Sequence, residues 1–319
     1  LLAISRQNKR NQSEGKSSTF NSEGFDEEEK SMNPFKIIGY PHPCTPFSLY
    51  FFKFLRNLFE IYTFPSFQSK LSYELQERCT EAIYSMFIST PNEQCAYVLA
   101  NYIPIILNFM ESEINNYKLL SNDMEISDRI PSYTHICHFC IMLSGIVENA
   151  GQSIREFEKP IMDLLICLLN LKSQSIHPEA LTTMTKMVKS IKSDIIPYFG
   201  LFEIINFSLT SGNSNIIKKS AILSYFILEA DNSESISFSF ETIKSLFDAL
   251  YSNIMYVNHA IDLDCKLELI AVFGKILRLV KVAAEPFFSS YGRILDSNSK
   301  MPLDLLRDED VEVAKELFP

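Results

Sequence analysis

Glycine is scarce in this chain and tryptophan is absent: the 319 residues include nine glycines and no tryptophan, against 25 phenylalanines. The glycines do not form a glycine-rich phosphate loop, and the sequence contains no His-Glu-x-x-His pair. The apolar residues recur at helical rather than alternating spacing. Together these features argue against a phosphate-binding α/β enzyme and favour an all-α protein.

Positive charge is also in short supply, because 29 Lys and Arg stand against 39 Asp and Glu, for a formal net charge of −10. A phosphate backbone has to be met by clustered Lys and Arg, so we expect no direct binding of nucleic acid. The least charged run, residues 94–110, contains Asn101, Pro104 and Asn108 and is too polar and too short to span a bilayer. We therefore expect no membrane insertion, whereas a basic protein partner is compatible with the charge.

The seven cysteines are scattered and odd in number, which suits a reducing compartment better than a disulfide scaffold. The stretch HICHFC places His135, Cys137, His138 and Cys140 together. Its C-x-x-C spacing is the short half of a zinc site, but no second Cys or His pair follows at the usual distance. On a helix the two cysteines share a face, which indicates packing in a core.

We accordingly expect no metal ligands, no cofactor and no catalytic residues, and we do not expect an enzyme. The five histidines have no Ser-His-Asp arrangement that the sequence supports. An enzyme that depends on a metal or a thiol at Cys137 and Cys140 is one alternative, and a metal analysis of the purified protein tests it.

The chain is organised as a polar segment followed by a series of helices. Residues 1–33 are rich in Ser, Asn, Glu and Lys, so we expect a disordered segment or loop. Residues 34–296 read as a helical-repeat array with a long connection near 111–130, and residues 297–319 as the start of a further, truncated repeat. Since the sequence starts Leu1-Leu2 and ends inside a periodic pattern, we expect a piece of a longer protein. The predicted helices are 46–62, 71–89, 96–119, 132–149, 154–172, 178–192, 194–209, 215–229, 237–252, 262–282 and 284–296.

Four prolines mark a recurring element, in which a proline in or near the first turn of a helix is followed by an apolar stripe: Pro104, Pro160, Pro197 and Pro286. Proline is tolerated there because the first amides of a helix have no partner within the helix. Pro197 lies 37 residues after Pro160 and 89 residues before Pro286. This spacing fits a period of about forty residues, which is typical of HEAT or armadillo arrays. The sequence therefore predicts an all-α solenoid of antiparallel helical hairpins, whose second helices line the concave surface.

Several stretches in this order carry a family resemblance: EALTTMTKMVKSI, then DIIPYFGLFEIINFSLTSGNSNIIKKSAILSYFILEA, then CKLELIAVFGKILRLVKVAAEPFFSSYGRIL. They resemble the middle-to-C-terminal HEAT repeats of the importin β (karyopherin β) family. Upstream, SYELQERCTEAIYSMFIST and YVLANYIPIILNFMESEI fit the preceding repeats, so the resemblance covers most of residues 46–296. The chain departs from the family in having no tryptophan, the residue with which the family's inner surface grips its adaptor.

The resemblance implies a nuclear transport receptor for protein import. Its partners would be an importin-α-type adaptor or a basic cargo, the Ran GTPase and nucleoporins with Phe-Gly repeats. It would work in the cytoplasm, in the nucleus and at the pores of the nuclear envelope.

The resemblance also suggests two sets of partner-binding residues. Acids on second helices would meet basic signals through their summed field. The acids favoured for this role are Glu179, Glu229, Asp262, Asp264 and Glu268, and further acids of this kind are Glu74, Glu77, Glu81 and Glu148. Aromatic residues would receive the phenylalanines of Phe-Gly repeats, and the candidates are Phe199, Phe202, Phe207, Phe247 and Tyr251. The rival hypothesis is a HEAT-repeat scaffold of a phosphatase or a chromosome-associated complex, which would need neither Ran nor Phe-Gly binding.

Overall fold

The computed structural model describes residues 37, 39–41, 45–64, 70–121, 133–171, 173–191, 201–230 and 240–255, and five positions between 265 and 273. The chain divides into two units, 1–36 and 37–319, and all the described residues belong to the second. The segment 1–33, expected to be disordered, and the expected start of a further repeat at 297–319 lie outside the described residues.

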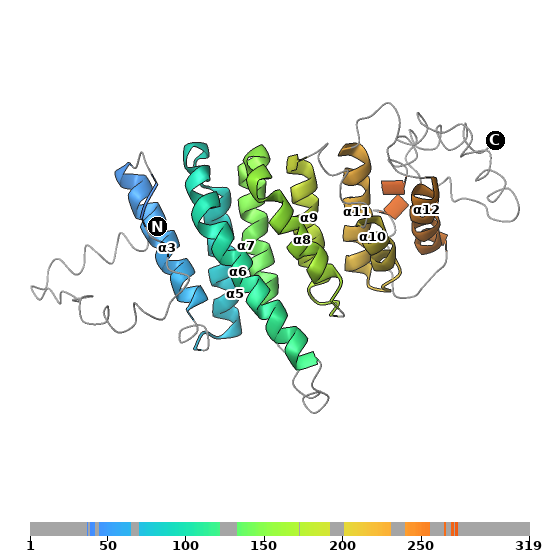
Figure 1. The fold of residues 1–319 in the computed structure, drawn as a ribbon, viewed down its shortest axis with the longest axis horizontal. Helices are drawn as coiled ribbons and strands as arrows, with labels where there is room; N and C mark the ends of the chain where they lie inside the picture. Colours follow the sequence, from blue (N-terminus) through green and yellow to red (C-terminus); the bar gives the residue numbers. More distant parts are fainter. Residues whose placement is uncertain are drawn as a thin grey trace, which may run out of the picture. The chain divides into compact units, whose positions relative to one another are not determined.

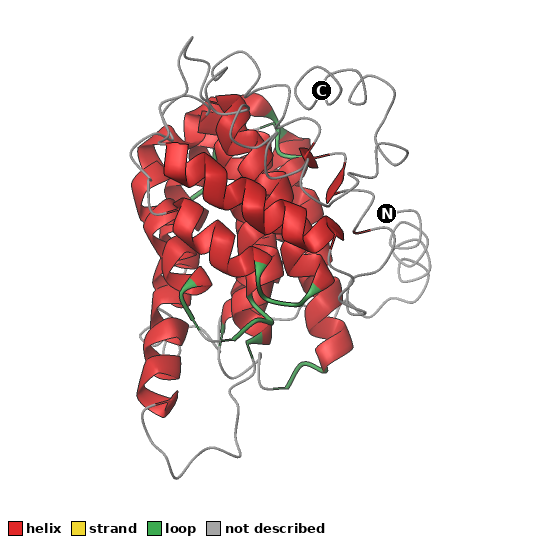
Figure 2. Ribbon diagram, turned by 90° about the vertical axis from the view of Figure 1, so that its right-hand side faces the viewer, coloured by secondary structure: helices red, strands yellow, loops and turns green. Residues whose placement is uncertain are grey.

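Every regular element among the described residues is a helix, and none of these residues lies in a strand (Figure 2). This confirms the predicted all-α class. The elements are α3 (Pro46–Thr63), α5 (Tyr73–Ile88), the 3-10 helix η1 (Asn92–Gln94), α6 (Cys95–Ser121), α7 (Thr134–Ala150), the 3-10 helix η3 (Gly151–Phe157), α8 (Glu158–Leu169), α9 (His177–Ile191), α10 (Leu201–Leu209), α11 (Ser214–Ala230) and α12 (Phe240–Met255).

The helices of the second unit form two layers (Figure 1). One layer, the second-helix layer, consists of α5, α7, α9 and α11, each packed on the next. The other, the first-helix layer, consists of α3, α6, α8, α10 and α12 in the same order. The layers meet within hairpins, because α6 packs on α7, α8 on α9 and α10 on α11. The array is the predicted helical-repeat solenoid.

The repeat period is visible in the second-helix layer, where α7, α9 and α11 begin at residues 134, 177 and 214, or 43 and 37 residues apart. The step from α5 to α7 is longer, from 73 to 134, because α6 has 27 residues and a further connection follows it. The sequence analysis expected a helix at 96–119 and a long connection near 111–130, two ranges that overlap. Residues 111–121 belong to α6, where Ile114 is buried on the same face as Met110.

The proline-led start is confirmed for α8, where Pro160 is the third residue. Pro46 likewise lies in the opening turn of α3, where the side chain of Thr45 accepts a hydrogen bond from the backbone N–H of Ser48. Pro104 contradicts the rule, because it lies well inside α6 rather than in its first turn.

The helix runs through Pro104 because buried residues continue on both sides of it, among them Leu99, Tyr102 and Ile106. Burial of this face outweighs the roughly 3 kcal/mol that an interior proline costs. Pro197 and Pro286 lie outside the described residues.

Aromatic rings join the two layers near the start of the array. Phe59 of α3 packs edge-to-face on Tyr102 of α6 with 5.1 Å between the ring centroids, and Phe87 of α5 is 5.1 Å from the same Tyr102. Phe139 of α7 lies 6.4 Å from Phe59. All four side chains are fully buried, so four helices share one apolar centre.

Gly145 permits the closest approach between α5 and α7. A Cβ atom at this position would lie 2.8 Å from Cδ2 and 3.1 Å from the carbonyl oxygen of Tyr84. A side chain here would require the Tyr84 ring to shift and the α5 backbone to move back by a few tenths of an ångström, so it strains the contact between the two helices.

We predict that Gly145→Val lowers the free energy of unfolding by about 2 kcal/mol or more, because the added atoms overpack the α5–α7 contact. Thermal unfolding followed by circular dichroism measures this as a lower Tm. Ser85→Val is the matched control, since it places the same side chain at an exposed position of α5, and it should change stability by less than about 0.5 kcal/mol. Equal melting temperatures for the two variants would contradict the close approach.

Candidate binding surface

The acids expected to meet basic signals lie on the second-helix layer wherever the structure describes them. Glu74, Glu77 and Glu81 are exposed on α5, and Glu229 is exposed near the end of α11. Glu179 is half-buried in the first turn of α9. Asp262, Asp264 and Glu268 lie outside the described residues. The described acids are therefore distributed over successive helices rather than gathered in one cluster.

The same four helices also carry bases, which the sequence interpretation did not weigh against the acids. Their five bases are Arg78, Lys186, Lys189, Lys218 and Lys219, and their six acids are Glu74, Glu77, Glu81, Glu148, Glu179 and Glu229. The formal charge of α5, α7, α9 and α11 together is therefore only −1. The net charge of −10 for the whole chain thus overstates how acidic this layer is.

Several of these acids have partners within the chain. Arg78 Nη1 lies 3.1 Å from Glu81 Oε2 on the same helix. The hydroxyl group of Tyr225 donates a hydrogen bond to Glu229 Oε1 at 2.5 Å. Because both pairs are exposed, each contributes at most about 1 kcal/mol, and a stronger ligand can replace it.

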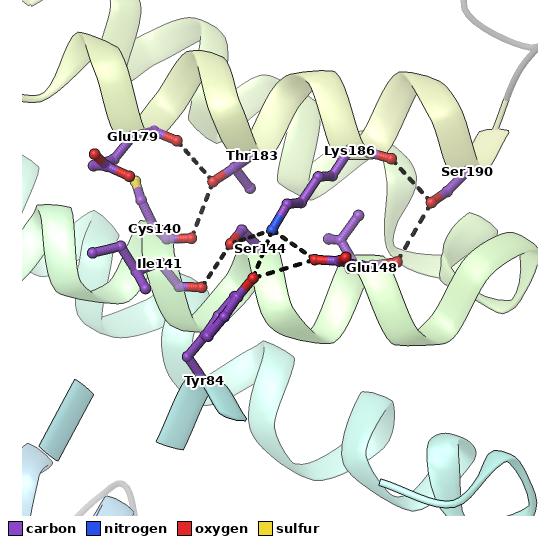
Figure 3. A network of polar contacts seen from close by, with 10 residues as sticks. Tyr84, Cys140, Ile141, Ser144, Glu148, Glu179, Thr183, Lys186 and Ser190 are labelled. Carbon is purple, nitrogen blue, oxygen red and sulfur yellow. Dashed lines mark hydrogen bonds and ion pairs between the residues drawn. The ribbon is translucent and has the colours of Figure 1, made fainter. Parts of the chain in front are cut away.

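The most connected acid is Glu148, which belongs to a polar network between three helices of the second-helix layer (Figure 3). Lys186 of α9 places its Nζ 2.8 Å from Glu148 Oε2. The same ammonium donates hydrogen bonds of 3.2 Å to the hydroxyl groups of Tyr84 and Ser144. Tyr84 in turn donates to Glu148 Oε2 at 3.3 Å, so α5, α7 and α9 are linked at one point.

This network shifts the pKa values of Glu148 and Lys186 in the directions that favour their charged forms. The hydrogen bond from Lys186 holds the pKa of Glu148 below its usual value, although partial burial opposes this. Burial acts to lower the pKa of Lys186, but hydrogen bonds to Glu148 and Tyr84 outweigh it, and the pKa is raised. Carboxylate and ammonium therefore both stay ionised at neutral pH.

Among the aromatic candidates for Phe-Gly binding, the structure describes the side chains of two, of which one is exposed and one is buried. Phe207 of α10 is 70% exposed. Phe202 is 2% exposed, since it lies on the face of α10 that also buries Ile205 and Leu209, so its prediction as a binding residue is wrong. Phe199 lies outside the described residues, as do the side chains of Phe247 and Tyr251 on α12.

A second apolar surface was missed by the sequence analysis. Phe47, Tyr50, Phe54 and Ile61 are exposed along one side of α3, while Phe52, Leu55 and Phe59 are buried on the other. The signal was present in PFSLYFFKFLRNLFEIYT, because apolar residues surround the helix instead of following one stripe.

The HICHFC group forms part of the packing between α3, α5 and α7. Cys140 and His138 are buried, and a hydrogen bond joins the hydroxyl group of Tyr62 to Nδ1 of His138. Burial raises the pKa of Cys137 to about 11 and also raises that of Cys140, so both thiols stay protonated at neutral pH. Among the described residues, no group of three or more His, Cys, Asp or Glu could hold a metal ion. The searched helices include none with the length and apolarity needed to cross a membrane.

Comparison with known proteins gives one family match and a structural match for the array. Residues 39–314 match the model of a family described as importin subunit beta-1-like, TPR repeats, and the matched range includes all the described helices. Among solved structures, the crystal structure of an engineered protein matches with a TM-score of 0.44 and 14% identity, over 83% of this chain and 96% of that chain. A search of curated proteins gives no match.

We predict that acid weakens the α3–α5–α7 contact through His138. Burial, together with the nearby His135, lowers the pKa of His138 to about 4, although Glu77 acts to raise it. The stability that the neutral imidazole contributes is thus complete above the unfolded value of about 6.5 and is lost as the pH falls towards 4. For a shift of this size the loss is roughly 3 kcal/mol.

Urea unfolding at several pH values between 7.5 and 4 measures this loss as a falling midpoint. His138→Gln should flatten the pH dependence between 6.5 and 4, because it removes the titrating group and retains hydrogen-bonding capacity towards Tyr62. His135 and His177 also have lowered pKa values, so some slope should remain. A slope that is the same in the variant and the wild type would contradict the assignment to His138.

Proposed function

The chain belongs to the importin subunit beta-1-like family of repeat proteins, and on this premise we propose that it is part of a nuclear transport receptor. The observation that carries the proposal is the family match over residues 39–314, which includes the whole two-layer array. The family description names TPR repeats, and the sequence analysis expected HEAT repeats. Both classes are stacks of helical hairpins, and the steps of 43 and 37 residues exceed the 34 residues of a TPR unit.

In this role the second-helix layer binds a basic import signal, on an adaptor of the importin-α type or directly on a cargo. Support comes from the exposed carboxylates on α5 and α11 and from the half-exposed Glu148 on α7, which succeed one another along the stack. A layer of this kind binds an extended polycation through many weak contacts. The five bases on the same helices limit the strength of each contact, so the affinity depends on where the ligand places its charges.

The remaining partners of the proposed receptor are the Ran GTPase and nucleoporins with Phe-Gly repeats, and its place of action is the cytoplasm, the nucleus and the nuclear pores. For the nucleoporins, Phe207 supplies an exposed ring on α10. The adjacent Asn206 donates a 2.8 Å hydrogen bond to Ser245 of α12, so Phe207 lies close to the junction of two first helices.

A non-transport scaffold of helical repeats is the second candidate. The near balance of six acids and five bases on the second-helix layer favours it, since a scaffold needs no excess of negative charge. Binding of a basic import peptide and of Phe-Gly peptides distinguishes the two functions.

We predict that the chain binds a basic import peptide with an affinity that falls steeply as salt rises. Exposed charges interact over about 10 Å at 0.1 M salt and over about 3 Å at 1 M, so the attraction should be lost across this range. Reversing Glu179 and Glu229 to Lys should weaken binding by about tenfold and flatten the salt dependence. Fluorescence anisotropy of the labelled peptide measures both effects.

Glu203→Lys is the matched control for the single reversal Glu229→Lys, because each changes the charge by the same amount and Glu203 is exposed on α10 of the first-helix layer. It should change the affinity less than twofold. An equal loss in the control would mean that net charge rather than the second-helix layer governs binding, and no binding at low salt would favour the scaffold.

We predict that Phe207→Ala weakens binding of a Phe-Gly repeat peptide by about three- to tenfold, because an exposed aromatic ring offers apolar area to the ligand. Because Phe207 is 70% exposed, the change removes little buried area, so the melting temperature should change little. Surface plasmon resonance gives the affinity, and a peptide with each Phe replaced by Ala is the control ligand. Unchanged affinity for the Phe-Gly peptide would exclude Phe207 from the site.

A further inference from the structure

Tyr84, Ser144 and Glu148 form a cation-binding arrangement on two adjacent helices, and we refer to these three residues as the Tyr84–Glu148 site. Its present occupant is Lys186, which arrives from α9 (Figure 3). The ammonium uses its three N–H groups on Glu148 Oε2 at 2.8 Å and on the two hydroxyl oxygens at 3.2 Å. It also lies 5.0 Å from the centroid of the Tyr84 ring.

This set of groups suits any alkylammonium or guanidinium group. The carboxylate supplies charge, the hydroxyl groups accept hydrogen bonds, and the aromatic face attracts a cation through its quadrupole. None of the three groups depends on the occupant belonging to the same chain. The side chain of Glu148 is 49% exposed, whereas that of Lys186 is 20% exposed. The carboxylate can therefore be reached from solvent while the internal lysine covers the rest of the site.

We propose that the Tyr84–Glu148 site binds a lysine or arginine side chain of a basic ligand, and that Lys186 is an internal competitor that the ligand displaces. The inference rests on the proposed function, because it names one position at which the second-helix layer recognises a basic signal. It differs from a general electrostatic attraction in requiring an exchange of one cation for another.

The exchange is physically balanced. A ligand cation replaces the charge and the hydrogen bonds of Lys186 one for one, so Glu148, Tyr84 and Ser144 keep a partner. The displaced lysine recovers rotamer freedom and hydrates its ammonium in water. The lowered pKa of Glu148 keeps the carboxylate ionised throughout. A neutral or weakly bound ligand therefore does not displace Lys186, whereas a ligand that brings several cations at once does.

Lys189 provides a matched comparison on the same helix. Its ammonium lies 4.0 Å from the centroid of the Phe226 ring on α11 and acts on Glu148 only as a weaker, more distant charge. Replacing Lys186 or Lys189 by Met removes the same charge from α9, but only the first change vacates the Tyr84–Glu148 site.

The test is fluorescence anisotropy of a labelled peptide of lysine and arginine residues, with the full 319-residue chain at low salt. Lys186→Met should raise the affinity about three- to tenfold, because the ligand no longer competes with an internal cation. Lys189→Met should raise it less than twofold. Adding Glu148→Gln to Lys186→Met should cancel the gain, and thermal melts of all variants establish that each is folded.

A second measurement uses the wild-type chain and so does not depend on the folding of a variant. Mass spectrometry after brief acetylation of amines should show Lys186 protected in the free protein and several-fold more reactive when the peptide is bound. The reactivity of Lys189 should stay the same.

Peptide binding that leaves Lys186 protected, with equal affinities for the wild type and Lys186→Met, would overturn the exchange while leaving recognition of basic signals intact. If no variant binds the peptide, Lys186→Met included, then the exchange and the proposed recognition of basic signals both fail.

Discussion

The array depends on the burial of α7, which has neighbours on several sides at once. Ten of the twelve residues from 136 to 147 are buried, because α5 and α9 pack on either side of α7 while α6 packs on it from the other layer. A single hairpin cannot bury a helix in this way, so each hairpin is stable only when it is stacked on the next. Stacking also fixes the distance between neighbouring helices, and at Gly145 an added Cβ would lie only 2.8 Å from the Tyr84 ring.

Close stacking determines how polar groups between second helices are satisfied. The hydroxyl group of Thr183 on α9 donates to the carbonyl oxygen of Cys140 on α7 at 3.0 Å, and Ser190 donates to that of Val147 at 3.4 Å. Lys186 lies between these contacts and brings its charge to Glu148. The polar contacts thus run along the whole α7–α9 junction, where unpaired groups would weaken the stack.

The same arrangement links structure to the proposed binding of basic signals. Side chains that do not enter the stack remain at the outer edge of the second-helix layer, where α5, α9 and α11 each carry both acids and bases. A ligand that crosses several helices therefore meets a pattern of charges rather than a uniform field, and specificity arises from matching this pattern. Glu148 belongs both to this pattern of charges and to the contact between helices. Its partner Lys186 also donates a hydrogen bond to Ser144 at the junction of α7 and α9.

The sequence by itself determined the helical class, the two-helix repeat and most helix limits, which agree within two residues for 46–62, 71–89, 96–119, 132–149, 178–192 and 215–229. It could do so because a helix that buries one face repeats its apolar residues every 3.6 positions. The rule that proline lies in the first turn of a helix misplaced Pro104, since burial along α6 outweighed the local preference of proline. Exposure and pairing were decided only by the tertiary structure: Phe202 and Phe207 share a short helix yet face opposite environments. Likewise, Tyr84 meets Glu148 and Lys186 across 64 and 102 residues of sequence, because stacking rather than local pattern brings distant side chains together.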